Sequence, residues 1–153
     1  MSTPLHPIIV HFPIVMLLLG AAAQIIAIWK PDFFEKMANY LLVGGFITGV
    51  AAYMTGDGAE EYAEANLNAA RGLIHTHENL ALLSLAVFGL AIVLKYFRYR
   101  RPNFKILTPV LLACIIAGAG LISVTGHYGG KIVYPANVTD QNTTNDQNNG
   151  DRD

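Results

Sequence analysis

Four long apolar runs occupy most of the chain and leave few folds open to it. They cover residues 7–29, 38–56, 72–97 and 109–126. Each approaches the roughly 20 residues that an α-helix needs to cross a hydrocarbon layer about 30 Å thick. Only helices and closed barrels satisfy the backbone in such a layer, and the runs lack the alternation of barrel strands. The sequence therefore predicts an all-α membrane protein, a four-transmembrane-helix bundle with up-down antiparallel topology.

Composition agrees with this fold class and sets the domain boundaries. Of the 153 residues, 53% are hydrophobic and only 14% are charged, which is unlike a soluble domain. The formal net charge of −1 gives no basic surface for nucleic acid. We expect one transmembrane domain at residues 1–135 and a disordered polar tail at 136–153, which is too poor in apolar residues to fold. The single cysteine, Cys114, is interpreted as a packing residue.

Glycines mark the expected end of the fourth run. Gly126, Gly129 and Gly130 are predicted to end this helix in a short turn. We expect the turn to fold over the mouth of the bundle and to point His127 inward. The alternative is an ordinary helix end with His127 facing water.

Two further features each have two interpretations. Pro13 lies inside the first run and frees the carbonyl of Ile9, which gives either an ordinary kink or a bend that aims His11 inward. Small residues such as Gly45 and Gly118 interrupt the second and fourth runs, and they favour either close helix packing or space for a planar ligand.

Basic residues are concentrated in the two loops that join runs one to two and three to four. Seven of the ten Lys and Arg residues lie on the face that holds these loops: Lys30, Lys36, Lys95, Arg98, Arg100, Arg101 and Lys105. The positive-inside rule places these loops in the cytoplasm. We therefore expect a bacterial inner-membrane protein with both termini outside, so that the opposite end faces the periplasm.

All five histidines fall at that periplasmic end. His11 and His77 lie about one turn inside runs one and three, so they match in depth. In a four-helix square these runs are diagonal, and diagonal histidines at equal depth suit bis-imidazole ligation of a haem. His127 ends the fourth run beside them. His6 and His75 are interpreted as amphipathic side chains at the headgroup level.

Acidic residues lie at the same end, so a second set of ligands, for a metal ion rather than a haem, is also possible. Glu61 and Glu78 could bind a Zn, Cu or Fe ion together with the histidines, or orient an imidazole through its other nitrogen. An acidic, solvated and partly helical loop is the simpler interpretation of the segment TGDGAEEYAEAN.

Four segments together resemble a bacterial membrane family catalogued as domain of unknown function 2231. They are LHPIIVHFPIVMLLL at 5–19, TGDGAEEYAE at 55–64, HTHENLAL at 75–82 and TGHYGGKIVY at 125–134. Ile132 stands where the closing motif of the family often has Leu. The resemblance covers nearly the whole chain except the tail.

This resemblance implies a four-helix inner-membrane protein in redox surroundings. Related chains are often joined to Rieske or cytochrome c-type domains, so such proteins, or a respiratory complex, are the implied partners beside the lipid bilayer. This chain has neither a CxxCH motif nor Rieske ligands, and any electron partner must be a separate protein. His11, His77 and His127 lie in the matching motifs, so the resemblance implies that these three are the functional residues.

Three functions remain open from the sequence. The first is a haem b protein that passes electrons near the periplasmic face, with His11 and His77 as axial ligands, His127 beside them, and Arg71 paired to a propionate. The second is a non-haem metal site made of His11, His77 and His127 with Glu61 or Glu78. The third is a structural or assembly subunit of a respiratory complex. All three favour an electron-transfer or binding subunit over a stand-alone enzyme.

Overall fold

The computed structural model describes residues 6–67, 70–101 and 103–134, with the backbone alone at 7, 57 and 58. Within these ranges the chain is helical and contains no strand. The helices are α1 (His6–Ile9), α2 (His11–Ile26), α3 (Pro31–Met54), α4 (Gly56–Leu67), α5 (Arg71–Arg100) and α6 (Leu107–Val133). The predicted polar tail at 136–153 lies outside the described residues.

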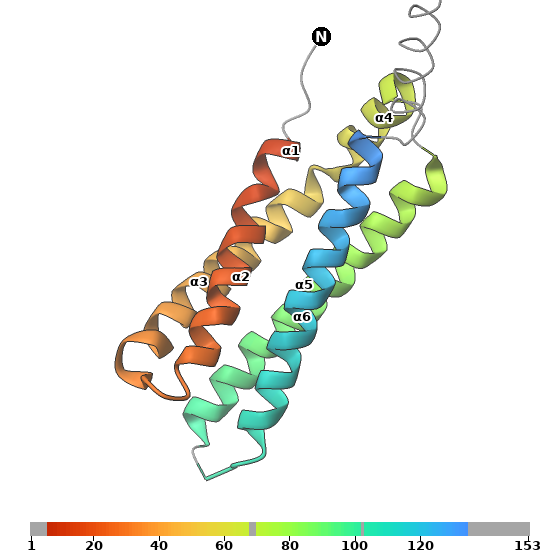
Figure 1. Cartoon of the computed structure of the whole chain (residues 1–153). Helices are drawn as coiled ribbons and strands as arrows, with labels where there is room; N and C mark the ends of the chain where they lie inside the picture. The colour runs from red at the N-terminus through yellow and green to blue at the C-terminus, as the bar shows by residue number, and fades with distance from the viewer. Residues whose placement is uncertain (1–5, 68–69, 102, 135–153) are drawn as a thin grey trace, which may run out of the picture.

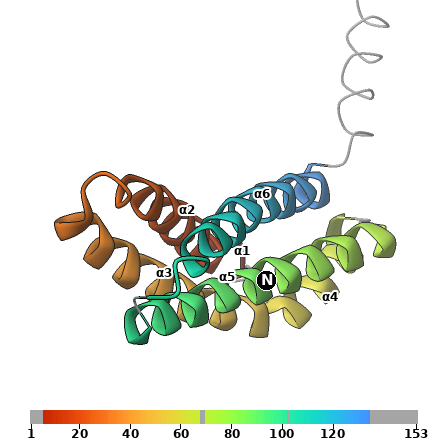
Figure 2. The ribbon, with the colours of Figure 1, turned by 90° about the horizontal axis from the view of Figure 1, so that it is seen from below.

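Four of these helices run side by side as two hairpins. Helix α2 packs along α3, and α5 packs along α6 (Figure 1). The hairpins meet where α3 touches α5 and α2 touches α6, so the view from below shows α2 and α6 in one layer and α3 and α5 in the other (Figure 2). Helices α2 and α5 are therefore diagonal, as the first and third runs are in a four-helix square.

The all-helical prediction is confirmed, and three helices are long and apolar enough to cross a membrane: α3, α5 and α6. Helix α2 is apolar but has only 16 residues, or about 24 Å at 1.5 Å per residue. Pro13 explains its late start. Proline has no N–H to bond the carbonyl of Ile9, so the helical hydrogen-bond pattern is interrupted at Val10 between α1 and α2, although the backbone of Val10 stays helical.

Glycines let the two helices of each hairpin approach closely. A Cβ added to Gly45 of α3 would lie 2.8 Å from Cγ of Leu17 on α2, and one added to Gly118 of α6 would lie 3.0 Å from the ring of Phe88 on α5. Leu17 and Phe88 are both fully buried. At these positions the small residues serve packing, so the packing interpretation is confirmed there. Cys114 also packs, partly buried, against the core.

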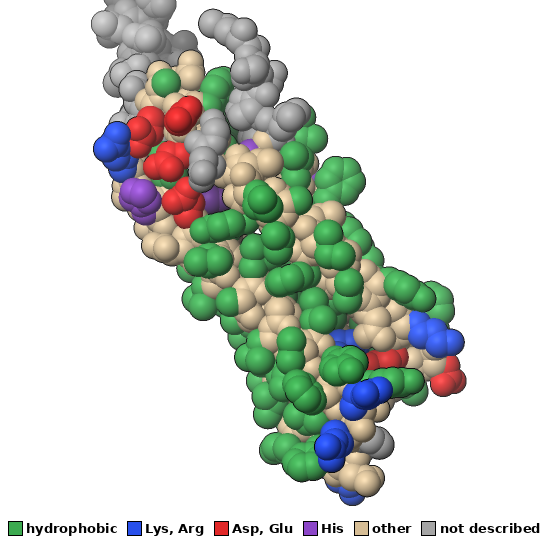
Figure 3. Space-filling view, turned by 180° about the vertical axis from the view of Figure 1, so that it is seen from behind, with side chains coloured by type: hydrophobic (Ala, Val, Ile, Leu, Met, Phe, Trp, Pro, Cys, Tyr) green, Lys and Arg blue, Asp and Glu red, His purple; other side chains and the backbone are tan. Residues whose placement is uncertain are grey.

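The outer surface has the polarity of a membrane protein. Large apolar side chains are exposed along the middle of the molecule, including Val15, Ile47, Leu82 and Ile116. Figure 3 shows this apolar surface between one end that carries histidines and acidic residues and another that carries mainly Lys and Arg. So much exposed apolar surface is expected of a protein whose solvent is lipid.

The expected glycine turn at the end of the fourth run is wrong. Helix α6 continues through Gly126, Gly129 and Gly130 to Val133. Glycine lowers helix stability by only about 1 kcal/mol, and hydrogen bonding and packing outweigh that cost. One reason for glycine here is space, since a Cβ on Gly129 would lie 3.1 Å from Cε1 of His77. At this end of the bundle, helix α4 contacts α1, α3, α5 and α6, in the place where the glycine turn was expected.

Candidate functional site

Two histidines face the interior of the histidine end, and α1 supplies the first. His6 begins α1 and is half-buried, and its Nδ1 lies 3.1 Å from Oγ1 of Thr55, at the end of α3. The Thr55 hydroxyl donates its only hydrogen to the carbonyl of Ala52, 2.7 Å away. A hydroxyl that donates to Ala52 can accept from His6, and in that arrangement Nδ1 of His6 carries the proton.

Helix α5 supplies the second interior histidine. His77 lies in the second turn of α5 and is half-buried against α6, where its Nδ1 is 2.9 Å from the backbone carbonyl of Thr125. A carbonyl only accepts, so Nδ1–H donates. Gly129, one turn further along α6, leaves room for the ring.

With Nδ1 donating in both contacts, the two imidazoles have the same tautomer and the lone pair of each lies on Nε2. An Nδ1–H bonded to a carbonyl or hydroxyl is the arrangement that orients histidine ligands of metals. His6 and His77 lie close enough for their charges to repel.

The other predicted cofactor residues lie further out. His11 begins α2 with its side chain exposed, whereas His6 is half-buried and its charge interacts with that of His77. His127 is exposed on α6, and its ring meets the neighbouring Tyr128 edge-on, with 6.0 Å between centroids. The expectation that His127 points inward is therefore wrong. Arg71 is exposed and forms a two-pronged ion pair with Glu64, at 2.7 and 3.0 Å.

The acidic residues do not complete a metal site in the described part of the chain. Glu61 is exposed on α4, and Glu78 is half-buried with an oxygen 3.4 Å from Nδ1 of His75. Among the described side chains, no group of three or more His, Cys, Asp or Glu residues is placed to hold a metal ion. The side chain of Asp57 lies outside this description.

A second polar cluster, at the opposite end of the molecule, was not predicted from the sequence. Lys95 of α5 is buried, and its ammonium donates to Oε1 of Gln24 on α2 and to Oε1 of Glu35 on α3, the latter at 2.9 Å. The amide of Gln24 donates to the other Glu35 oxygen at 3.2 Å, and Nη2 of Arg98 lies 2.9 Å from Glu35. We call these four residues the charged cluster. It connects three helices and joins the two hairpins.

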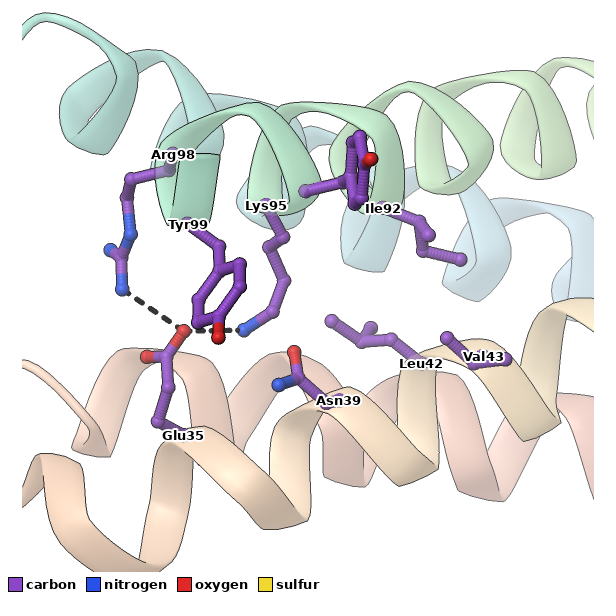
Figure 4. A pocket seen from close by; sticks show the side chains of 9 residues that line it. Glu35, Asn39, Leu42, Val43, Ile92, Lys95, Arg98 and Tyr99 are labelled. Carbon is purple, nitrogen blue, oxygen red and sulfur yellow. Dashed lines mark hydrogen bonds and ion pairs between the residues drawn. The ribbon is translucent and has the colours of Figure 1, made fainter. Parts of the chain in front are cut away.

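An open groove of about 490 Å³ lies beside this cluster, between α3 and α5. Figure 4 shows Glu35, Lys95 and Arg98 at one end of it and Leu42, Val43 and Ile92 at the other. The groove is therefore polar at one end and apolar at the other.

The sequence carried a signal for the charged cluster. Gln24 interrupts an apolar stretch, and Lys95 lies within the third run, inside the LKYF segment. Polar and ionisable residues within a membrane span usually have a partner. Counting Lys95 among the loop residues concealed this, because α5 extends to Arg100 and includes it.

The geometry at both ends defines an all-helical membrane protein with a histidine pair at one end and a charged groove at the other. The family described as "Predicted membrane protein (DUF2231)" matches residues 2–142, so the chain belongs to that family and the resemblance is confirmed. The comparisons with curated proteins and with solved structures found no match.

Proposed function

We propose that the histidine end binds haem b and passes electrons near the periplasmic face of a bacterial inner membrane. The observation that carries this proposal is a pair of half-buried imidazoles, His6 and His77, each with Nδ1 hydrogen-bonded within the chain. Donation from both Nδ1 atoms leaves the Nε2 lone pair of each imidazole for a ligand. His77 stays the ligand expected from the sequence, and His6 takes the place of His11 beside it.

The donor set favours haem over a bare metal ion. Zn, Cu or non-haem Fe sites need three or four protein ligands, whereas haem iron receives four nitrogens from its porphyrin and needs only one or two. Two half-buried imidazoles, His6 and His77, lie at this end, and no group of three or more candidate ligands is found among the described side chains. His127 and Arg71 lie on the same end, and the Arg71 side chain could leave Glu64 for a propionate, because exposed ion pairs are weak.

The residues of this chain would position the group and limit access to it. A bound haem would supply a one-electron iron couple. The carbonyl of Thr125 holds the ring of His77 in orientation, and Thr55 does the same for His6. Separate cytochrome c-type or Rieske proteins, or a respiratory complex, are the partners we propose.

A visible spectrum of the purified protein, with and without dithionite, tests this proposal. We expect a Soret band that shifts on reduction and a sharp α band, with iron stoichiometric to protein. Stoichiometric metal without these bands would favour a non-haem ion site and contradict haem.

If the protein shows neither these bands nor bound metal, a structural or assembly subunit is favoured instead. One observation supports such a structural role. The Nδ1 bonds of His6 and His77 connect α1 to α3 and α5 to α6, so both histidines also fasten helices together.

We propose that the chain crosses the membrane four times, with both termini in the periplasm. The first span consists of α1 and α2 together, and the other three are α3, α5 and α6. The basic loops at the end opposite the histidines carry this orientation. An alkaline phosphatase reporter fused after Asp153 should be active, and the same reporter inserted at Asn103 should be silent. A silent reporter after Asp153 and an active one at Asn103 would show the opposite orientation, with the histidine end in the cytoplasm.

A further inference from the structure

We propose that the groove beside the charged cluster binds an anionic phospholipid of the surrounding membrane, with its phosphate at Arg98. This site lies at the opposite end from the histidine pair and does not depend on a cofactor there.

The polar end of the groove has one unbalanced positive charge. Lys95 and Arg98 carry two positive charges and Glu35 carries one negative charge, while Gln24 is neutral. Lys95 is buried and its ammonium is engaged by Gln24 and Glu35. Arg98 is only half-buried; its guanidinium has five N–H donors and forms an ion pair with Glu35 at 2.9 Å through Nη2. The excess charge is therefore presented to the groove by Arg98, and it matches the single charge of a phosphodiester.

The apolar end of the groove suits an acyl chain rather than a soluble anion. Leu42 and Val43 of α3 line one side, and Ile92 of α5 faces them across the groove (Figure 4). These residues lie along α3 and α5 toward the middle of the molecule, whose exposed surface is apolar. A phosphate at Arg98 thus continues into a path for hydrocarbon.

The position of the cluster along the helices fits a headgroup. Glu35 lies in the second turn of α3, and Arg98 lies in the last turn of α5. Tyr96 and Tyr99 border the groove and are exposed at 58% and 84%. Tyrosines concentrate where hydrocarbon meets water, which is the depth of lipid phosphates. Nearby basic residues such as Lys36, and Arg100 with its guanidinium over the ring of Tyr96, favour anionic lipid at this end.

Native mass spectrometry and lipid titration of the full chain in neutral detergent test this site. We expect phosphatidylglycerol to bind in preference to phosphatidylcholine with the same acyl chains. Arg98→Gln should weaken phosphatidylglycerol binding about tenfold or more, because it removes a charge-assisted contact. Arg101→Gln, an exposed position beyond the end of α5, is the matched control and should bind as the unmodified chain does.

Two further arms separate a lipid from a free anion and from a folding defect. Val43→Trp fills the apolar end without changing charge, and it should also weaken the lipid while leaving the helical circular dichroism spectrum intact. Excess inorganic phosphate should not displace the lipid. Equal binding of the two lipids, equal effects of Arg98→Gln and Arg101→Gln, or full displacement by phosphate would each overturn the proposal.

Discussion

Replacing Glu35 with Ala should lower the free energy of unfolding by about 3 kcal/mol, because removing one partner of a buried ion pair leaves the other charge uncompensated. The side chain of Lys95 is only 7% exposed, and Glu35 is its anionic partner. Removing one partner of a buried ion pair usually costs about 3–5 kcal/mol. We expect the low end of that range because the Glu35 side chain is 29% exposed. Reversible unfolding in mixed micelles, followed by circular dichroism, measures the change.

A matched control comes from the other carboxylate that is paired with an arginine. Glu64 binds Arg71, whose side chain is 77% exposed, so Glu64→Ala should cost about 1 kcal/mol or less. Changing Lys95 to Met in a Glu35→Gln background should recover most of the lost stability, since an apolar side chain needs no partner. Equal losses for Glu35→Ala and Glu64→Ala would show that the charged cluster does not stabilise the helix contacts.

The helical fold was predictable because apolar runs of this length allow few alternatives in lipid. The ends of the helices were not. Gly126 and Gly130 favour a helix end by local preference, but α6 continues to Val133. Helix α3 begins at Pro31, before the apolar run at 38, because proline is favoured in a first turn whatever the polarity that follows. Boundaries follow capping and tertiary contacts, which hydropathy does not record.

The candidate site was predictable to the level of one end of the bundle, but not to its individual side chains. Their equal depth predicted that His11 and His77 are paired ligands. Depth along a helix does not determine which way a side chain points around it. A missing hydrogen bond at Val10 separates α1 from α2, and it is His6 of α1 whose charge interacts with that of His77. The charged cluster depends on contacts between Gln24 and Lys95, which are 71 positions apart, and no local pattern encodes such a pair.

The second large effect concerns His77, the residue on which the proposed cofactor depends most. Changing it to Gly should abolish haem binding or convert a low-spin spectrum to a high-spin one, because an axial nitrogen is lost. His75→Gly is the control on the same helix, since His75 is exposed and lies beside Glu78. That variant should keep the spectrum of the unmodified protein.

Rescue by free imidazole separates a ligand from a structural role. The space left by the ring of His77, next to Gly129, can admit imidazole, which restores a missing ligand but not the bond that fastens α5 to Thr125. The most direct test is the dithionite-reduced spectrum of His77→Gly with and without added imidazole. We predict that the low-spin α band is lost in this variant and returns with imidazole. An α band that survives in His77→Gly without imidazole would contradict the assignment of His77 as a haem ligand.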